Sequence, residues 1–187
     1  MLNFEITDAG LISQLFLSVG MTTFLQAAEY IKQLPYGRNA NKRNLATIFS
    51  DQCGTCSTKH AVLKVLADEN RISGLHLMIG MYRMNAKNTP PVAEVLSQFN
   101  LEYIPEAHCY LRFGDLILDY TKYGDKLFEF LPDLLEEKVI TPEQIVDYKV
   151  NFHQWFMENW LIENPQLTYN LKELWTIRER CIQAIGD

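Results

Sequence analysis

Three side chains of this sequence have the types that thiol-based acyl chemistry needs: a cysteine, a histidine and an aspartate. Cys56 follows the turn-forming pair Gly54-Thr55 at the point where a helical pattern begins. The positive end of a helix dipole and a neighbouring imidazolium both lower the pKa of a thiol. We therefore take Cys56 as the candidate nucleophile, with its own backbone N–H and the side chain of Gln52 as candidate oxyanion donors.

The base and the group that orients it are predicted on one hairpin. Two strand-like runs, Ala107–Phe113 and Leu116–Thr121, flank Gly114-Asp115, which suits a two-residue turn. Side chains alternate between the two faces of a strand, so in that register His108 and Asp119 share a face as diagonal neighbours. A carboxylate beside a histidine fixes its tautomer and stabilises the imidazolium. The sequence thus predicts His108 as the base and Asp119 as its orienting residue.

The same region contains two other patterns. Cys53 and Cys56 have the C-x-x-C spacing of dithiols that cycle to a disulfide, although the helical chain before them lacks the strand–helix–strand pattern of thioredoxin-like proteins. A zinc site would draw on the cysteines and histidines of this region: Cys53, Cys56, His60, His108 and Cys109. His108 and Cys109 point to opposite faces of a strand, so only one of them could join. Thiol–disulfide exchange is therefore the alternative function, ahead of a zinc site.

His60 is the other candidate for the base. It lies four residues after Cys56, on the same helix face, and helical side chains lean toward the helix start. No carboxylate partner for His60 is evident in the sequence, so a structural role is favoured. The remaining histidines and cysteines are interpreted as structural groups: His76, His153, Cys109 and Cys181.

Several short segments between residues 50 and 122 are similar to a known family. They are Gly54-Thr55-Cys56-Ser57, Gly74-Leu75, Gly80-Met81-Tyr82, Ala107-His108-Cys109-Tyr110 and Leu118-Asp119-Tyr120-Thr121. In this order they resemble the glycine–any–cysteine motif, the following strand, the base strand and the closing aspartate–any–threonine strand of the transglutaminase-like superfamily, in particular its small bacterial members. The chain departs from the family pattern in a short His-to-Asp interval and in Tyr110, where a tryptophan is common.

The resemblance implies a papain-like core with a triad of Cys56, His108 and Asp119, and chemistry without a metal or other cofactor. The nucleophile would attack an amide or ester carbonyl in a peptide, a protein or a small amide, as the peptidases, amidases and transglutaminases of the superfamily do. The departures from the family pattern leave the substrate class open. A non-catalytic interaction module on the same fold is a further alternative.

The composition is that of a globular protein. The 187 residues are 48% hydrophobic and 21% charged, enough for a core without disulfide staples. Basic residues number 17 against 23 acidic ones, and because no basic stripe is interleaved with aromatics, nucleic-acid binding is not expected. The basic cluster Arg38–Arg43 is interpreted as a solvated loop. No run of ~18 apolar residues and no signal-peptide pattern is found, so we expect no membrane span and a cytoplasmic protein with free thiols.

The elements that must position the triad follow from apolar spacing and chain breakers. Besides the hairpin, these predict a helix over 8–34 with a break at Gly20, a helix over 56–68, a strand over 72–84, a helix over 90–99 and helix from 132 to the end. Asp8 would cap the first helix and Pro35 would end it. Loops Asn85–Pro91 and Tyr123–Asp125 would form the walls of the site. We expect a single α+β domain over 1–187, with the transglutaminase-like core at 45–125 and a helical C-terminal extension from 132.

Overall fold

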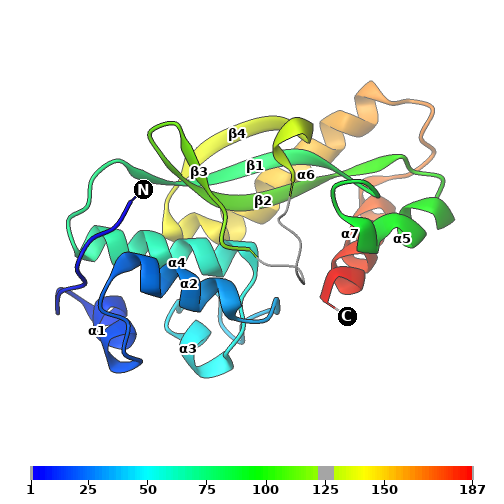
Figure 1. Ribbon diagram of the computed structural model, residues 1–187. Coiled ribbons are helices and arrows are strands. Elements are labelled where there is room, and N and C mark those ends of the chain that lie inside the picture. The colour runs from blue at the N-terminus through cyan, green and yellow to red at the C-terminus, as the bar shows by residue number, and fades with distance from the viewer. Residues whose placement is uncertain (1, 122–128, 187) are drawn as a thin grey trace.

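The computed structural model describes residues 2–121 and 129–186 (Figure 1). The predicted loop Tyr123–Asp125 lies outside the described residues. Within them, helices are combined with one antiparallel sheet of four strands, which is the α+β class expected from the sequence. None of the helices in this part of the chain has the length and apolar character needed to cross a membrane.

The sheet has the strand order β3-β2-β1-β4. Its strands are β1 (Leu75–Asn85), β2 (Tyr103–Phe113), β3 (Leu116–Leu118) and β4 (Leu134–Ile140). β1 and β2 pair over their whole length, from Leu75 opposite Phe113 to Asn85 opposite Tyr103. β4 pairs with the other side of β1, so the two longest strands form the centre of the sheet.

The β2–β3 hairpin has the register expected from a two-residue turn. The ladder runs from Phe113 opposite Leu116 to Leu111 opposite Leu118. The first residue of the turn is a glycine with a φ of 56°, a conformation that this kind of turn favours. β3 ends three residues earlier than predicted, so Asp119 lies just beyond the last ladder pair.

Helices come before, between and after the strands. They are α1 (Leu11–Ser18), α2 (Phe24–Gln33), α3 (Thr47–Asp51), α4 (Cys56–Glu69), α5 (Ala93–Gln98), α6 (Asp147–Glu163) and α7 (Leu171–Gly186), with 3-10 turns η1 (Pro90–Val92), η2 (Leu131–Asp133) and η3 (Pro142–Ile145). The break predicted at Gly20 is confirmed. The cap of the first helix is Gly10 rather than Asp8, so that prediction is wrong by two residues.

Two apolar clusters hold the helices against the sheet. One joins α1, α2 and α4 to alternate positions of the central strands, such as Leu77 and Ile79. The other joins α5, α6 and α7 to the intervening positions, such as Met78 and Tyr110. Figure 1 shows α4 running along the sheet beside α2, with α5 and α7 near the opposite end. The two-residue period of the strands therefore divides the core between an N-terminal and a C-terminal set of helices.

Residues 134–140 correct the prediction of an entirely helical C-terminal extension, because they form β4. Charged residues occupy the middle of this segment, and most of its side chains are half-buried or exposed. An edge strand of this kind lacks the clean apolar alternation by which a strand is found in a sequence. From Asp147 onward the helical prediction is confirmed by α6 and α7.

Candidate active site

Cys56 is the first residue of α4 and is 5% exposed. The preceding residue, Thr55, is extended, and its backbone N–H donates to Thr58 Oγ1 at 3.0 Å, which fixes the start of the helix. Gly54 is closely packed, since a Cβ there would lie 2.9 Å from Ile48 Cδ1 and 3.0 Å from Lys59 Cγ, so a larger residue would have to displace these side chains. The glycine–any–cysteine motif thus lets the chain pass over α3 and places the thiol at the N-terminal end of a helix, where unpaired backbone N–H groups favour an anion.

His108 and Asp119 are brought together as the hairpin register predicted. His108 is 2% exposed, and its Nε2 lies 2.8 Å from Asp119 Oδ2. The backbone N–H of Thr121 donates to the other carboxylate oxygen at 2.7 Å and holds it in place. The His108 side chain is also hydrogen-bonded to the Cys56 thiol. Because Asp119 occupies Nε2, the nitrogen that faces the thiol is Nδ1.

The electrostatics of this pair favour a charged imidazole. Burial lowers the pKa of His108, but the charge and hydrogen bond of Asp119 outweigh it and raise that pKa to about 9. Burial likewise raises the pKa of Asp119, yet the charge and hydrogen bond of His108 outweigh it and the net shift is downward. At neutral pH the pair is therefore an imidazolium against a carboxylate.

The pKa of the Cys56 thiol lies well below its usual value. The largest cause is a side-chain hydrogen bond with Cys109, and Lys149 and His108 add positive charge, against burial, which raises the pKa. The pKa of Cys109 is raised by the same hydrogen bond, so Cys109 stays a protonated thiol and its S–H donates the hydrogen bond to the Cys56 thiolate. Cys109 is buried in the core as predicted, but it also contacts the nucleophile.

His60 has a structural role in this arrangement. The ring is fully buried, its Nδ1 lies 2.8 Å from the Cys56 carbonyl oxygen, and the Tyr120 N–H donates to its Nε2 at 2.7 Å. Nε2 is therefore an acceptor and Nδ1 carries the proton, which is the neutral tautomer. Burial lowers the pKa of His60, consistent with that state. His60 also has a carboxylate nearby that sequence position did not reveal, since Asp119 Oδ1 lies 3.4 Å from Nε2.

Gln52, predicted as an oxyanion donor, makes other contacts. Its amide nitrogen donates to the Phe49 carbonyl at 2.6 Å and to the Tyr30 hydroxyl at 3.1 Å. Gln52 is exposed and has a left-handed backbone conformation at the end of α3. The structure does not bring this side chain to Cys56, because both of its amide donor contacts are with α2 and α3.

The cysteines of the C-x-x-C pattern occupy different environments. Both Cys53 and Cys56 are free thiols, and Cys53 is half-buried. Burial and the nearby Asp51 carboxylate raise the pKa of Cys53, opposite to the shift at Cys56. For residues 2–121 and 129–186, no three histidine, cysteine or carboxylate side chains are grouped so that they could hold one metal ion.

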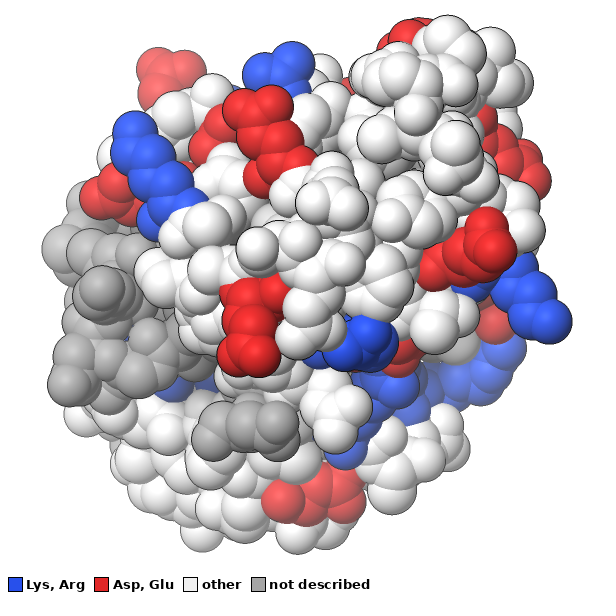
Figure 2. Space-filling model, turned by 90° about the vertical axis from the view of Figure 1, so that its right-hand side faces the viewer, with Lys and Arg blue, Asp and Glu red and all other residues white. Residues whose placement is uncertain are grey.

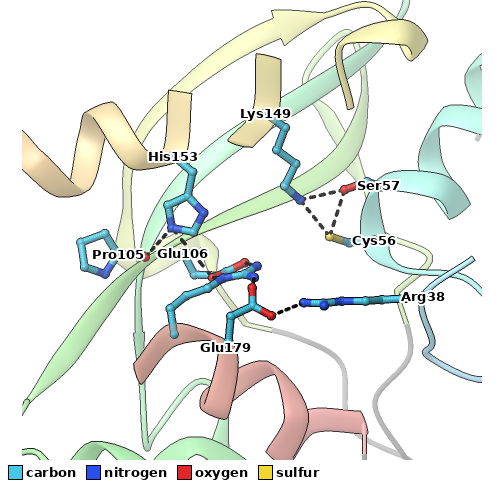
Figure 3. Close-up of polar contacts among 9 residues, drawn as sticks. Arg38, Cys56, Ser57, Pro105, Glu106, Lys149, His153 and Glu179 are labelled. Carbon is cyan, nitrogen blue, oxygen red and sulfur yellow. Dashed lines mark hydrogen bonds and ion pairs between the residues drawn. The ribbon is translucent and has the colours of Figure 1, made fainter. Parts of the chain in front are cut away.

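A cavity of about 230 Å³ opens beside Cys56. Cys56 and Ser57 form part of one wall, and α6 and α7 supply much of the rest (Figure 3). The Lys149 ammonium, from α6, points at the start of α4. It donates to Ser57 Oγ at 2.7 Å and lies 3.6 Å from Cys56 Sγ. Burial lowers the pKa of Lys149, but the neighbouring thiols and the Glu106 carboxylate reverse the shift and keep the ammonium charged.

A chain of ion pairs forms the opposite wall. Glu106, from β2, accepts two bonds from the Arg178 guanidinium at 2.7 and 2.5 Å, and Arg178 in turn donates to Glu179 at 2.7 Å. The second oxygen of Glu179 accepts from Arg38, as Figure 3 shows. Burial raises the pKa of Glu106, but Arg178 reverses the shift and lowers it. These residues lie far apart in the sequence, and their spacing carried no signal of the network.

His153 and the loop before α3 complete the cavity. His153 is buried as a structural residue, with Nε2 2.8 Å from the Pro105 carbonyl oxygen, and burial lowers its pKa to about 4. The basic segment Arg38–Arg43 is a loop as predicted, and Arg43 is exposed. The interpretation of the whole segment as solvated is corrected, because Arg38 and Lys42 line the cavity.

Comparisons of the chain with known proteins found no relative. No family model, no curated protein and no solved structure matches it.

Proposed function

We propose that this chain is a thiol-dependent hydrolase or acyltransferase that acts on an amide or ester through Cys56, His108 and Asp119, on a transglutaminase-like, papain-like core. The observation that carries the proposal is the 2.8 Å contact between His108 Nε2 and Asp119 on a histidine that is also hydrogen-bonded to a helix-start thiol. An activated cysteine, a base and an orienting carboxylate are the three parts that covalent acyl chemistry requires.

In the first half of the reaction, the Cys56 thiolate attacks the carbonyl carbon and the carbonyl oxygen becomes an oxyanion. The backbone N–H of Cys56, at the start of α4, supports that charge. His108 then gives its Nδ1 proton to the leaving nitrogen or oxygen as the bond to carbon breaks. The products are a free amine or alcohol and a thioester between Cys56 and the acyl group.

In the second half, water or an amine attacks the thioester carbonyl. His108, now neutral, takes a proton from the attacking group, and Cys56 leaves as a thiolate. Asp119 stabilises the imidazolium at both stages. The site thus returns to the thiolate–imidazolium pair from which it began.

The test is the pH dependence of iodoacetamide alkylation, measured separately at each cysteine. We expect Cys56 to be labelled rapidly at pH ~6, where a thiol with an ordinary pKa of ~8.5 is ionised to less than ~1%. His108→Ala should slow this labelling by about tenfold to 100-fold, because the thiolate loses its imidazolium partner.

His60→Ala is the matched control, since it removes a second imidazole of the same cluster without removing the partner of the thiolate. Fast labelling of Cys56 should survive in this variant. Slow labelling of Cys56 in the wild type, or equal reactivity of Cys53 and Cys56, would overturn the proposal and favour the dithiol alternative.

A further inference from the structure

The charges around the cavity beside Cys56 do not balance. Its lining contains four basic side chains and two acidic ones, a formal charge of +2 that the Cys56 thiolate lowers to +1. The basic residues are Arg38, Lys42, Lys149 and Arg178, and the acidic ones are Glu106 and Glu179. His153 adds no charge at neutral pH, because burial lowers its pKa to about 4.

The two carboxylates are already occupied by the two guanidinium groups. Arg178 binds Glu106 through two nitrogens and Glu179 through a third, and Arg38 binds the free oxygen of Glu179. Both acidic side chains are therefore neutralised within the wall. The excess positive charge of the cavity resides on its two lysines.

The two lysines differ in what they contact. The Lys149 ammonium faces Ser57 and the thiol of Cys56, so it is compensated when that thiol ionises. Lys42 is half-buried, and among residues 2–121 and 129–186 it has no hydrogen-bond or ion-pair partner. Its pKa is lowered by burial first and then by the charge of Lys149. Lys42 also borders a second hollow that contains Glu143, without pairing with it.

From this imbalance we infer that the cavity binds an anionic group of the substrate, a carboxylate or a phosphate, between Lys42 and Lys149 and next to the carbonyl that Cys56 attacks. This inference rests on the proposed function and specifies its substrate class. A half-buried cation that pairs with no carboxylate among the described residues is costly in the free protein and gains most from an anion brought in by a ligand.

The size of the cavity limits what that group can be. A volume of about 230 Å³ is below the ~300–1,000 Å³ of sites for drug-sized ligands. Apolar walls from Ile145, Val150 and Trp175 accompany the lysines, which suits a short hydrocarbon segment ending in a charge. On the face shown in Figure 2, several basic side chains gather toward the lower right, while other charged groups are scattered over a largely uncharged surface. Positive charge on that face is local, so a small anionic group fits better than a polyanion.

The test compares two alkylating reagents that differ in charge, anionic iodoacetate and neutral iodoacetamide, on the full chain at pH ~6. In both reactions the thiolate displaces iodide and forms a carbon–sulfur bond, so the ratio of the two rates, divided by the same ratio for 2-mercaptoethanol, reports the effect of the protein on reagents of different charge. We expect this ratio at Cys56 to exceed the ratio for 2-mercaptoethanol by about tenfold, the effect of roughly one favourable charge contact.

Substitutions of Lys42 test whether the preference of Cys56 for the anionic reagent comes from the cavity. Lys42→Gln should lower the iodoacetate-to-iodoacetamide ratio by about fivefold, and Lys42→Arg, which keeps the charge, should preserve most of it. Lys87→Gln is the matched control, because it removes one exposed lysine that does not line the cavity. Glutarate and inorganic phosphate should protect Cys56 from iodoacetamide at saturating concentration, and the better protector identifies the anion as carboxylate or phosphate.

The outcomes separate this inference from the proposed function. Rapid labelling by iodoacetamide with a ratio equal to that of 2-mercaptoethanol, or a ratio unchanged by Lys42→Gln, would overturn the anion site and leave the nucleophile intact. Slow labelling by both reagents would overturn the activated thiol and, with it, the substrate class.

Discussion

The two sides of Cys56 are built in different ways. On one side, His108 and Asp119 are eleven residues apart and meet because one hairpin aligns them. On the other side, Lys149 comes from α6, 93 residues after Cys56, and Arg178 from α7 reaches Glu106 across 72 residues. In the proposed function, the first group activates the thiol. The second forms much of the cavity wall and would select what enters.

We expect the two sides of Cys56 to respond differently to substitution. The triad side is maintained by backbone pairing, so a changed side chain there alters chemistry more than folding. The cavity side is maintained by side-chain ion pairs between β2 and the C-terminal helices, so changes there also alter stability. Single substitutions should distinguish a loss of thiol chemistry from a loss of folding stability.

Glu106→Gln should produce the largest loss of stability. It leaves the Arg178 guanidinium, whose side chain is 12% exposed, without its bidentate partner, and breaking a buried ion pair on one side costs about 3 kcal/mol. Urea unfolding measures this change. The same substitution at Glu136, whose pair with Lys138 on β4 is more accessible, with side chains 36% and 41% exposed, should cost less than ~1 kcal/mol. Equal losses in the two variants would show that the ion-pair network does not hold the C-terminal helices to the sheet.

Asp119→Asn should alter chemistry with a smaller effect on folding. Because Asp119 is the group that raises the pKa of His108 to about 9, the variant should return that pKa toward 6.5 or below and slow Cys56 alkylation at pH ~6 by about tenfold. Titration of the His108 ring by NMR measures the shift. The sign for stability follows from the raised pKa: the wild-type advantage is full below pH ~6.5 and is lost as pH rises through about 9. An unchanged His108 pKa would contradict the assigned pair.

His60→Gln should weaken the link between α4 and the Asp119 segment without removing Cys56. The substitution disturbs two buried hydrogen bonds, one to the Cys56 carbonyl and one from the Tyr120 N–H, so unfolding free energy should fall by about 2 kcal/mol. Thermal or urea unfolding tests this. His76→Gln, at an exposed position of β1, is the control and should be neutral within ~0.5 kcal/mol. If both variants were equally stable, His60 would not be the link between α4 and the Asp119 segment.

Arg43→Ala should have the smallest effect. Arg43 belongs to the same loop as Lys42, but its pair with Asp147 is exposed, with side chains 66% and 71% accessible. Such pairs contribute between ~0 and ~0.5 kcal/mol, so urea unfolding should scarcely change, and the charge preference of Cys56 labelling should be retained. A large loss of that preference would mean that the positive charges of the whole loop, rather than Lys42 alone, attract the anionic reagent.

Much of the triad side could be predicted because its geometry is local. A glycine–any–cysteine turn before a helical pattern placed Cys56, and the turn between two strand-like runs gave the register that joins His108 to Asp119. The prediction for Gln52 was wrong in placement, because a residue close in sequence to the nucleophile was expected to turn toward it. The left-handed backbone at Gln52 directs its amide to Phe49 and Tyr30 instead.

The cavity side was decided by tertiary structure alone. Nothing in the sequence around Lys42 distinguishes it from Arg43, yet only the fold makes one a cavity wall and the other a surface residue. Likewise β4 is a strand because β1 offers it a free edge, although three of its seven residues are charged. The sequence by itself determined the local elements and the hairpin pairing, because hydrogen bonding and side-chain alternation act over a few residues. The tertiary structure decided which distant charges meet, because that depends on how helices pack across the sheet.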